Sequence, residues 1–315
     1  MNVMKKVRNL FTKDGLYFFT FYFLRFTRLE RYVPDEPFLK LKFRCYMHHK
    51  LNLYPPVTYN EKLQWLKLHD RNPLYTTLVD KYEVKKYVAN IIGEQYIIPT
   101  LGVWDNVDDI DFNRLPDQFV LKCNHDSGGI VICKDKAMLN IENTRSLLKK
   151  HLKTDCYKEG REWPYKNVKR KIIAEPYLED KLTRELRDYK FFVFDGDCRS
   201  MFIASERQKQ GTDTKFDFFD MSFNHLDLRH GHPNAVITPC KPVNFELMSK
   251  LAEKLGKGFP HVRVDFYEVN GKVYFGEMTF YHHTGMMPFE PSKWDTIFGN
   301  WLDLSKGAYR LKTNT

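Results

Sequence analysis

The sequence lacks the short motifs that identify many nucleotide-binding and hydrolytic proteins. It has no GxxxxGK[ST] phosphate loop and no strand–GxGxxG–helix unit, so neither a P-loop NTPase nor a dinucleotide-binding domain is supported. It has no GxSxG sequence, which excludes the nucleophile elbow of the α/β-hydrolases. His230-Gly-His232 and His282-His283 do not have the helical HExxH spacing, and no cysteine pair accompanies them. A zinc site is therefore not expected.

Cysteine pairs and long apolar runs are also missing. The six cysteines include no CxxC pair, and reduced thiols in a cytoplasmic protein are the simplest interpretation. The basic start at Lys5, Lys6 and Arg8 is not followed by the small-residue cleavage site of a secretory signal. The longest apolar stretch, Leu16–Leu24, is far shorter than the roughly 20 residues that cross a bilayer. We therefore expect a cytoplasmic protein without a transmembrane helix.

The composition is that of a folded, basic protein. The chain has 315 residues, 43% of them hydrophobic, which allows a large single unit or a few interlocked lobes. Its formal net charge of +10 would suit nucleic acid, an anionic membrane surface or an anionic substrate, and a solvated basic surface explains it equally well. The aromatic residues do not interleave with Lys and Arg on one predicted sheet face. We therefore expect no nucleic-acid partner.

The first 57 residues are predicted to form a basic, aromatic helical extension that ends at Pro55 and Pro56. Within it, Leu16–Leu24 is rich in aromatic residues and is flanked by Arg25 and Arg28. A helix packed on the main body or on a partner is the favoured interpretation. The alternative is peripheral contact of residues 1–50 with the inner face of a membrane.

The remaining sequence alternates short helices with short strands. Thr58 with Glu61, and Asp80 with Glu83, have the spacing of capping boxes, and the second opens a helix over 81–90 that stops at Gly93. Asp195-Gly196 and Asn270-Gly271 each separate two strand-like runs and suit tight turns with positive φ. Strands are predicted at 118–123, 130–133, 172–178 and 190–204, and helices at 140–153 and 245–255. The fold class is therefore α+β with mostly antiparallel sheets.

The predicted hairpin that begins at Arg263 carries the most informative pattern. Alternation puts Arg263 and Asp265 on one strand face, and Glu277 lies on the returning strand. Two carboxylates on neighbouring strands suit Mg²⁺ whose other ligands are phosphate oxygens and water, whereas a cross-strand salt bridge between Arg263 and Glu277 is the competing interpretation. A regular two-residue turn would pair Asp265 with Gly276. The metal hypothesis therefore requires a longer loop or a bulge.

Three other segments admit a binding interpretation beside a plain structural one. Lys122 ends a strand and precedes a polar loop ending in Gly128-Gly129, which suits either a phosphate or a surface hairpin. Glu175–Leu178 ends a strand where the backbone could pair with an adenine edge. Asp195-Gly-Asp197 is a DxD sequence of the kind that holds a divalent ion in many glycosyltransferases, but the hairpin-turn interpretation is favoured.

Taken in order, these segments resemble the TupA-like ATP-grasp family, which is found in bacterial surface-polysaccharide gene clusters. The likeness runs from about Tyr59 to Leu304. The segments that carry it are Tyr59–Trp65, Asp80–Tyr82, Phe119–Gly129, Glu175–Leu178, Asp188–Phe192, Arg263–Tyr267 and Gly276–Phe280. The resemblance implies an ATP-grasp fold with an N-terminal lobe (58–117), a lid-like small subdomain (118–178) and a C-terminal subdomain (179–315) that carries the Mg²⁺ and ATP site.

The resemblance also implies which residues bind the nucleotide. Lys81 and Lys122 would contact the phosphates of ATP, covered by the loop that contains Gly128 and Gly129. Glu175 would meet adenine through its carboxylate, and Leu178 would meet it through its backbone.

The resemblance places the metal site at the hairpin and the ribose nearby. Asp188 would lie near the ribose, and Arg263 would bind phosphate and share catalysis with Lys122. Asp265 and Glu277 would hold Mg²⁺. Many family members have Asn two residues after the second carboxylate, and here Thr279 takes this third metal position.

The implied activity is that of an ATP- and Mg²⁺-dependent carboxylate–amine ligase. It would activate a carboxylate as an acylphosphate and form an amide with an amine or amino acid. A basic protein suits an anionic saccharide, so the expected acceptor is a uronic acid of a capsular or other surface polysaccharide. The alternatives are a glycosyltransferase that uses Asp195 and Asp197 for a nucleotide sugar, and a non-catalytic ATP-binding protein.

Overall fold

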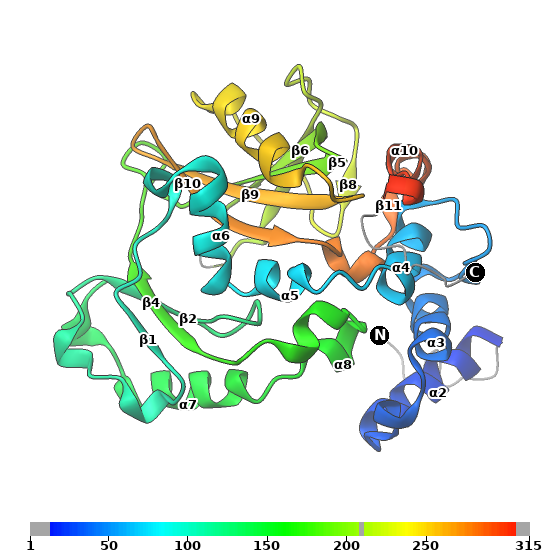
Figure 1. Cartoon of the computed structure of the whole chain (residues 1–315), viewed down its shortest axis with the longest axis horizontal. Helices are drawn as coiled ribbons and strands as arrows, with labels where there is room; N and C mark the ends of the chain where they lie inside the picture. The colour runs from blue at the N-terminus through cyan, green and yellow to red at the C-terminus, as the bar shows by residue number, and fades with distance from the viewer. Residues whose placement is uncertain (1–12, 208–210, 307–315) are drawn as a thin grey trace.

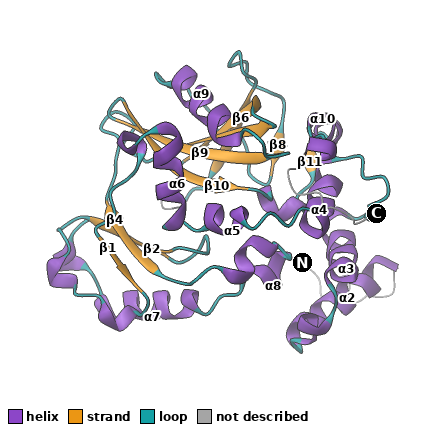
Figure 2. Cartoon of the chain, in the orientation of Figure 1, coloured by secondary structure: helices purple, strands orange, loops and turns teal. Residues whose placement is uncertain are grey.

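The computed structural model describes residues 13–207 and 211–306, and its strands form two main sheets (Figures 1 and 2). The smaller sheet has the order β1-β4-β2-β3, from β1 (Gly102–Trp104), β2 (Phe119–Cys123), β3 (Ile130–Cys133) and β4 (Ile172–Pro176). The larger has the order β10-β9-β5-β6-β7, from β5 (Asp188–Phe194), β6 (Asp197–Ser205), β7 (Lys215–Phe219), β9 (Val262–Val269) and β10 (Lys272–Thr279). A short pair joins β8 (Arg229–His230) to β11 (Phe289–Glu290).

All named strand pairs in the described ranges are antiparallel, so the predicted α+β class is confirmed. The short strands β1, β7, β8 and β11 had not been predicted. The helices are α2 (Lys13–Phe26), α3 (Asp35–Met47), α4 (Tyr59–His69), α5 (Leu74–Val79), α6 (Glu83–Ile92), α7 (Ile141–Leu152), α8 (Cys156–Gly160), α9 (Phe245–Gly256) and α10 (Lys293–Trp301).

Each sheet has its own hydrophobic core. The centre of the larger sheet is β5, whose residues are all buried, and α9 packs Met248 and Leu251 into the same core. The smaller sheet buries Leu121 and Ile172 against Leu148 of α7, which lies beneath it in Figure 1. The two cores are separate, so the space between the sheets is lined by a mixture of apolar and charged side chains.

The β9–β10 hairpin has both the predicted turn and an irregularity in its register. Asn270 and Gly271 have φ of 52° and 77°, and the flanking residues Val269 and Lys272 pair directly. A bulge follows at Gly276, after which Asp265 pairs with Glu277. A Cβ at Gly276 would lie 3.1 Å from the carbonyl oxygen of Asp265, so the close approach of the strands suits glycine. The bulge on which the metal hypothesis depends is therefore present.

The N-terminal helices pack on the body only in part. Leu39 and Phe43 of α3 belong to a small core with Met286, while Phe21 of α2 packs on Phe38 of α3. The other face of α2 is exposed. No helix within the described residues is long and apolar enough to cross a membrane. Residues 1–12 of the predicted extension lie outside the described part of the chain.

The first predicted capping box is confirmed and anchors α4. The Thr58 hydroxyl accepts a hydrogen bond from the backbone N–H of Glu61. The Glu61 carboxylate accepts from the backbone N–H groups of Thr58, Val57 and Asn52 at 3.1, 2.9 and 3.2 Å. At α6, Asp80 accepts from the N–H groups of Tyr82 and Glu83, but the described structure does not show the reciprocal contact of the Glu83 side chain.

Glu61→Ala should lower the free energy of unfolding by about 1–3 kcal/mol, because the substitution leaves partly buried backbone donors without an acceptor. Urea unfolding followed by circular dichroism measures the change. Glu83→Ala is the matched control, since the Glu83 side chain is exposed in the first turn of its helix. Equal losses in the two variants would contradict the role given to Glu61.

Candidate active site

A cleft of about 370 Å³ lies between the two sheets, within the usual size range of small-molecule sites. One wall comes from β2, β3 and β4, and the other from β5, β9 and β10. The cleft is lined by both apolar and charged side chains. Of the predicted site residues, it takes in Lys81, Lys122, Glu175, Leu178, Asp188 and Glu277.

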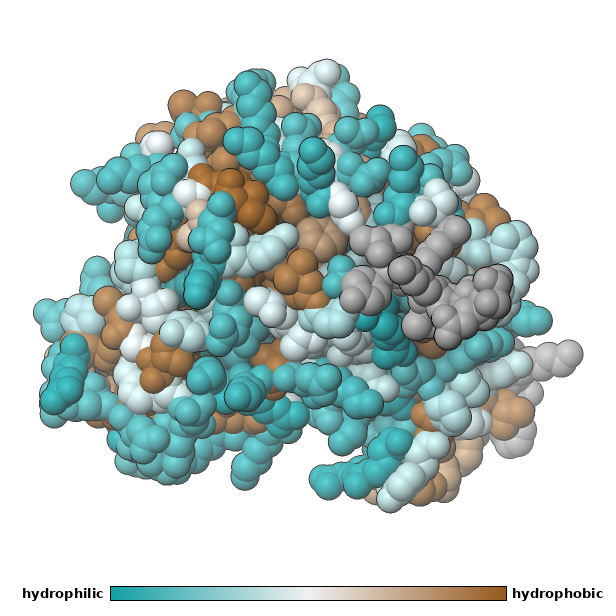
Figure 3. Space-filling view, viewed as in Figure 1, coloured by the Kyte–Doolittle hydropathy of each residue, from teal (hydrophilic) through white to brown (hydrophobic). Residues whose placement is uncertain are grey.

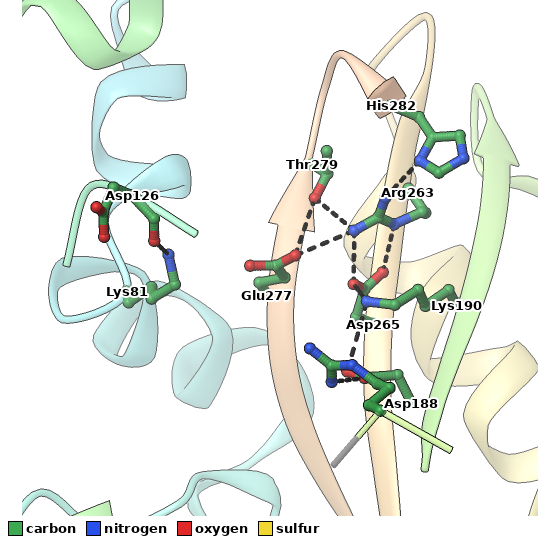
Figure 4. A network of polar contacts seen from close by, with 10 residues as sticks. Lys81, Asp126, Asp188, Lys190, Arg263, Asp265, Glu277, Thr279 and His282 are labelled. Carbon is green, nitrogen blue, oxygen red and sulfur yellow. Dashed lines mark hydrogen bonds and ion pairs between the residues drawn. The ribbon is translucent and has the colours of Figure 1, made fainter. Parts of the chain in front are cut away.

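Arg263 lies behind Glu277 and is the most highly connected side chain of this region (Figure 4). It is 7% exposed, and it donates to both oxygens of Asp265 at 2.7 Å through Nε and Nη2. Nη2 also donates to Glu277 at 3.0 Å and to the Thr279 hydroxyl at 2.9 Å. Nη1 donates to Nδ1 of His282 at 2.6 Å. The cross-strand salt bridge between Arg263 and Glu277 therefore exists alongside the paired carboxylates.

Asp265 is completely buried, and both its oxygens are used. Besides Arg263, its Oδ2 accepts a hydrogen bond from Lys190 of β5, which also lies 3.4 Å from Asp188. Burial lowers the pKa of Lys190, although the charge of Asp265 opposes the shift. Two cations thus already neutralise this carboxylate. Mg²⁺ could reach Asp265 only where Lys190 or Arg263 moves aside, for example toward a phosphate.

Glu277 is the more accessible carboxylate, with 38% of its side chain exposed to the cleft. Its removal from water would raise its pKa, but the charges of Lys190, Lys81 and Arg263 outweigh this and hold the pKa far below its usual range. It is therefore ionised at neutral pH. An ionised oxygen that faces a cleft, beside a second carboxylate on the neighbouring strand, fits a hard cation such as Mg²⁺.

Lys81 faces Glu277 from the opposite wall (Figure 4). Its backbone N–H donates to the carbonyl of Asn124 at 3.0 Å, and its Nζ donates to the carbonyl of Asp126 at 2.6 Å. Asn124 is buried and bonds to Asp80 at 2.8 Å. These bonds hold Lys81 on the loop between β2 and β3.

In that loop, Gly128 and Gly129 are needed for packing. A Cβ at Gly128 would lie 2.7 Å from the His151 ring, and one at Gly129 would lie 2.8 Å from the sulfur of Cys123. His151 in turn bonds to Asp126 at 2.5 Å. The residue of this loop that lines the cleft is Ser127. That these glycines cover phosphates stays a prediction.

Glu175 joins two lysines at the base of the cleft. Its carboxylate lies 2.5 Å from Nζ of Lys122 and 2.7 Å from Nζ of Lys85 on α6. Burial would raise the pKa of Glu175, but the two lysine charges outweigh burial and lower it. In this arrangement its carboxylate holds the lysines in place, so the predicted contact with adenine would compete with them.

Asp188 and Thr279 are both held by cations rather than left open. Asp188 is 2% exposed, pairs with Arg207 and lies beside Tyr267 on the neighbouring strand. The Thr279 hydroxyl accepts from Arg263 and lies 3.4 Å from the Glu277 carboxylate. Neither contact tests the ribose or metal roles that were predicted for these residues.

The family of the chain follows from its sequence as a whole. The family model described as TupA-like ATPgrasp matches residues 61–303. The chain belongs to this family. The resemblance inferred from the ordered segments is thereby confirmed, and so is the ATP-grasp fold. Among curated proteins, none matches the chain.

Solved structures with a similar fold include three ligases. They are a D-alanine–D-alanine ligase from Bacillus anthracis complexed with ATP (15% identity, 65% of this chain and 54% of that one, TM-score 0.36), the VanG D-Ala:D-Ser ligase from Enterococcus faecalis (14%, 72% and 60%, 0.41) and the D-cycloserine synthetase DcsG (15%, 74% and 72%, 0.40). The chain spans little more than half the length of the first. At these identities and scores, the structures do not bear on the activity of this chain.

Three groups of this TupA-like protein escaped the sequence analysis. Lys190 follows Asp188 by two on β5, and strand alternation could have placed it beside Asp265. Lys85 lies one helical turn after Lys81, but its partner Glu175 is remote in sequence. His230 meets His282 and His283 although it comes from a different hairpin, so no spacing could have revealed the cluster.

Glu175→Gln should lower the free energy of unfolding by about 3 kcal/mol at pH 7, because two lysines are left without a buried countercharge. The folded-state pKa of Glu175 lies below its ordinary 4.5, so its stabilisation is present above pH 4.5 and is lost as pH falls through the folded-state pKa. The difference between wild type and variant should therefore shrink in acid. Urea unfolding at several pH values measures it.

The matched control is Glu246→Gln, because Glu246 also lies 2.5 Å from a lysine but on the exposed surface. No measurable change is expected there. A pH-independent difference for Glu175→Gln would show that its packing matters rather than its charge.

Proposed function

We propose that the chain is an ATP- and Mg²⁺-dependent carboxylate–amine ligase. The observation that supports this best is the bulge at Gly276, which sets Glu277 opposite Asp265 on a cleft wall that faces Lys81. Paired carboxylates opposite a lysine suit a metal-bound triphosphate. In this proposal residues 58–117 form the N-terminal lobe, residues 118–178 with β2, β3 and β4 act as the lid-like subdomain, and residues 179–315 carry the metal site.

The proposed mechanism is charge stabilisation and positioning. Lys81 and Lys122 hold the phosphates from one wall, while Arg263 and Lys190 stabilise the transferring γ-phosphoryl group from the other. Mg²⁺, held by Glu277 and Asp265 with Thr279 nearby, would neutralise charge on the phosphate oxygens. A substrate carboxylate oxygen attacks the γ-phosphorus and ADP leaves. An amine then attacks the acyl carbon, phosphate leaves, and an amide remains.

For the substrates, we propose a uronic acid of a surface polysaccharide and an amine or amino acid. The net charge of +10 supports an anionic saccharide acceptor. The turn between β10 and β11 contains Gly285, which lies against Leu63 and Gln64 of α4, and this turn is the proposed acceptor side. The adenine would lie by Leu178 and the ribose by Asp188, both of which line the cleft.

The glycosyltransferase alternative has little support. Asp195 and Gly196 form a two-residue turn with φ of 48° and 91°, and Phe194 pairs directly with Asp197. The Asp197 side chain is 68% exposed and pairs with Arg199 in its own strand. Neither aspartate is among the residues that line the cleft. If the protein bound ATP without catalysis, the buried hydrogen-bond network around Arg263 would have no role in a reaction.

Asp265→Asn and Glu277→Gln should each lower ATP-dependent amide formation at least a hundredfold, because each removes a negative charge from the proposed metal site. ADP release in the presence of candidate uronic acids and amino acids measures the rate. Asp197→Asn is the control and should retain wild-type turnover. Wild-type turnover in Glu277→Gln, or a loss confined to Asp197→Asn, would rule out the ligase assignment.

We further propose that the protein is cytoplasmic and touches the inner membrane face through α2. Leu16, Phe19, Phe23 and Phe26 share one exposed face of this helix, and Phe26 is 91% exposed. Arg25 and Arg28 are exposed nearby. Figure 3 shows hydrophobic side chains at the lower right surface, where Figure 1 places α2 and α3. Aromatic residues with cations beside them suit an anionic lipid interface.

Replacing Phe19, Phe23 and Phe26 together by Ser should weaken binding to phosphatidylglycerol vesicles at least tenfold, because each ring contributes about 1.5–3 kcal/mol when buried. Vesicle co-sedimentation at two salt concentrations measures the binding. Val236→Ser with Ile237→Ser is the control, since both side chains are exposed elsewhere. Undiminished sedimentation of the triple variant would rule out α2 as the contact.

A further inference from the structure

Three histidines from two separate segments meet beside Arg263. His230 ends β8, and His282 and His283 lie in the turn that follows β10. One ring nitrogen of each lies within 4.8 Å of the other two. His230 and His282 are 0% and 2% exposed. We propose that these three residues, the histidine cluster, bind one transition-metal ion such as Zn²⁺, separate from the Mg²⁺ site.

Unpaired nitrogens are the main support for this site. Nδ1 of His230, Nε2 of His282 and Nε2 of His283 are buried and have no hydrogen-bond partner. Buried polar side-chain atoms are usually paired, and three unpaired atoms in one place need a common explanation. A single cation would satisfy all three at once.

The proton position at His230 agrees with metal binding. Nε2 of His230 donates to the carbonyl of Met287 at 3.0 Å, so its Nδ1 keeps a free electron pair. Nε2 of His283 is also buried and without a hydrogen-bond partner. The free electron pair on Nδ1 of His230 repels anions and attracts a cation.

His282 is the third ligand and couples the cluster to Arg263. Its Nδ1 accepts from Arg263, so in the neutral ring Nε2 carries the proton. Metal binding at Nε2 moves that proton to Nδ1 and breaks the hydrogen bond. Coordination of the ion by three imidazole nitrogens must therefore outweigh both the loss of this hydrogen bond and the approach of Nδ1–H to the guanidinium. The charge of Arg263 is already balanced by Asp265 and Glu277 on its other side.

The local backbone is built to bring the rings together. His283 and Thr284 have φ of 47° and 54°, which is unfavourable for residues with a side chain and requires support from the surroundings. A Cβ at Gly231 would lie 2.9 Å from Nε2 of His283, so only glycine permits this approach. Zn–N bonds of about 2.0–2.1 Å place ligand nitrogens roughly 3.3 Å apart, so the rings must close by up to about 1.5 Å.

The type of ion follows from the ligands. Neutral imidazoles prefer Zn²⁺, Cu²⁺, Ni²⁺ or Co²⁺ to Mg²⁺, which prefers carboxylate and phosphate oxygens. The Mg²⁺ site and the histidine cluster should therefore discriminate between the two kinds of ion.

The test uses the untagged full chain, without nucleotide, titrated with Co²⁺ in excess Mg²⁺ so that the carboxylates are occupied. Wild type should bind one Co²⁺ with the visible absorption of nitrogen-coordinated cobalt. His282→Gln and His283→Gln should each weaken binding at least tenfold. His49→Gln is the control, because His49 is exposed and is not one of the three clustered histidines.

Lys122→Ala, on the opposite wall of the cleft, should lower ligation but keep Co²⁺ binding, so failure of the ligase proposal and failure of this one can be told apart. X-ray absorption of the Zn²⁺-loaded wild type counts the ligands without any variant and should show three histidines. Absence of saturable Co²⁺ binding, unchanged affinity in His282→Gln and His283→Gln, or fewer than three histidines around Zn²⁺ would overturn the site.

Discussion

The guanidinium of Arg263 holds the site together. It joins β9 to β10 through Glu277 and Thr279, holds Asp265 on its own strand, and joins the hairpin to the following turn through His282. A cation buried among these groups is stable only because the carboxylates neutralise it, and removing one partner of a buried pair typically costs about 3–5 kcal/mol. The bulge at Gly276 is the backbone feature that allows this, since a regular register would turn Glu277 to the opposite face.

The charges around the cleft occur mostly in pairs of opposite sign. Three carboxylates line or adjoin the larger sheet's wall, and each is paired with at least one cation: Asp188 with Arg207, Asp265 with Lys190, and Glu277 with Arg263. Lys81 and Lys122 add positive charge from the other wall. A phosphate chain can therefore draw cations away from the carboxylates, and a divalent ion can replace them there. The exchange keeps each buried charge balanced. A cleft lined by charges of only one sign could not do this.

Local rules account for much of the fold and part of the site. The Asn270-Gly271 turn, the Thr58–Glu61 capping box and the strand that ends at Lys122 follow from residues close in sequence. From the sequence, the pairing of Asp265 with Glu277 could be stated as a requirement of the metal hypothesis. Whether the chain meets that requirement by a longer loop or by a bulge at Gly276 depends on how the strands pack. Sequence alone gives no measure of that packing.

Groups that meet only in the folded chain escaped prediction for the same reason. Lys85 reaches Glu175 from another element, and the histidine cluster needs β8 beside the turn after β10. The exposed face of α2 shows the opposite case: its aromatic residues were visible in the sequence, but which of them are buried depends on how α3 docks. Whether a side chain is buried depends on the residues that surround it in the folded chain, and a single sequence does not say which residues those are.

Arg263 also links the two proposed sites, the Mg²⁺ site of the β9–β10 hairpin and the histidine cluster, thermodynamically. Its Nη1 hydrogen bond to His282 can persist only while Nδ1 of that ring is unprotonated. A phosphate that draws the guanidinium toward the cleft removes this bond, and an ion on Nε2 of His282 removes it as well. Once one event has broken this hydrogen bond, the other event no longer has to supply the free energy for breaking it. If a bound phosphate raises the metal affinity of the cluster by some factor, thermodynamic linkage requires that a bound metal raise the phosphate affinity at Arg263 by the same factor.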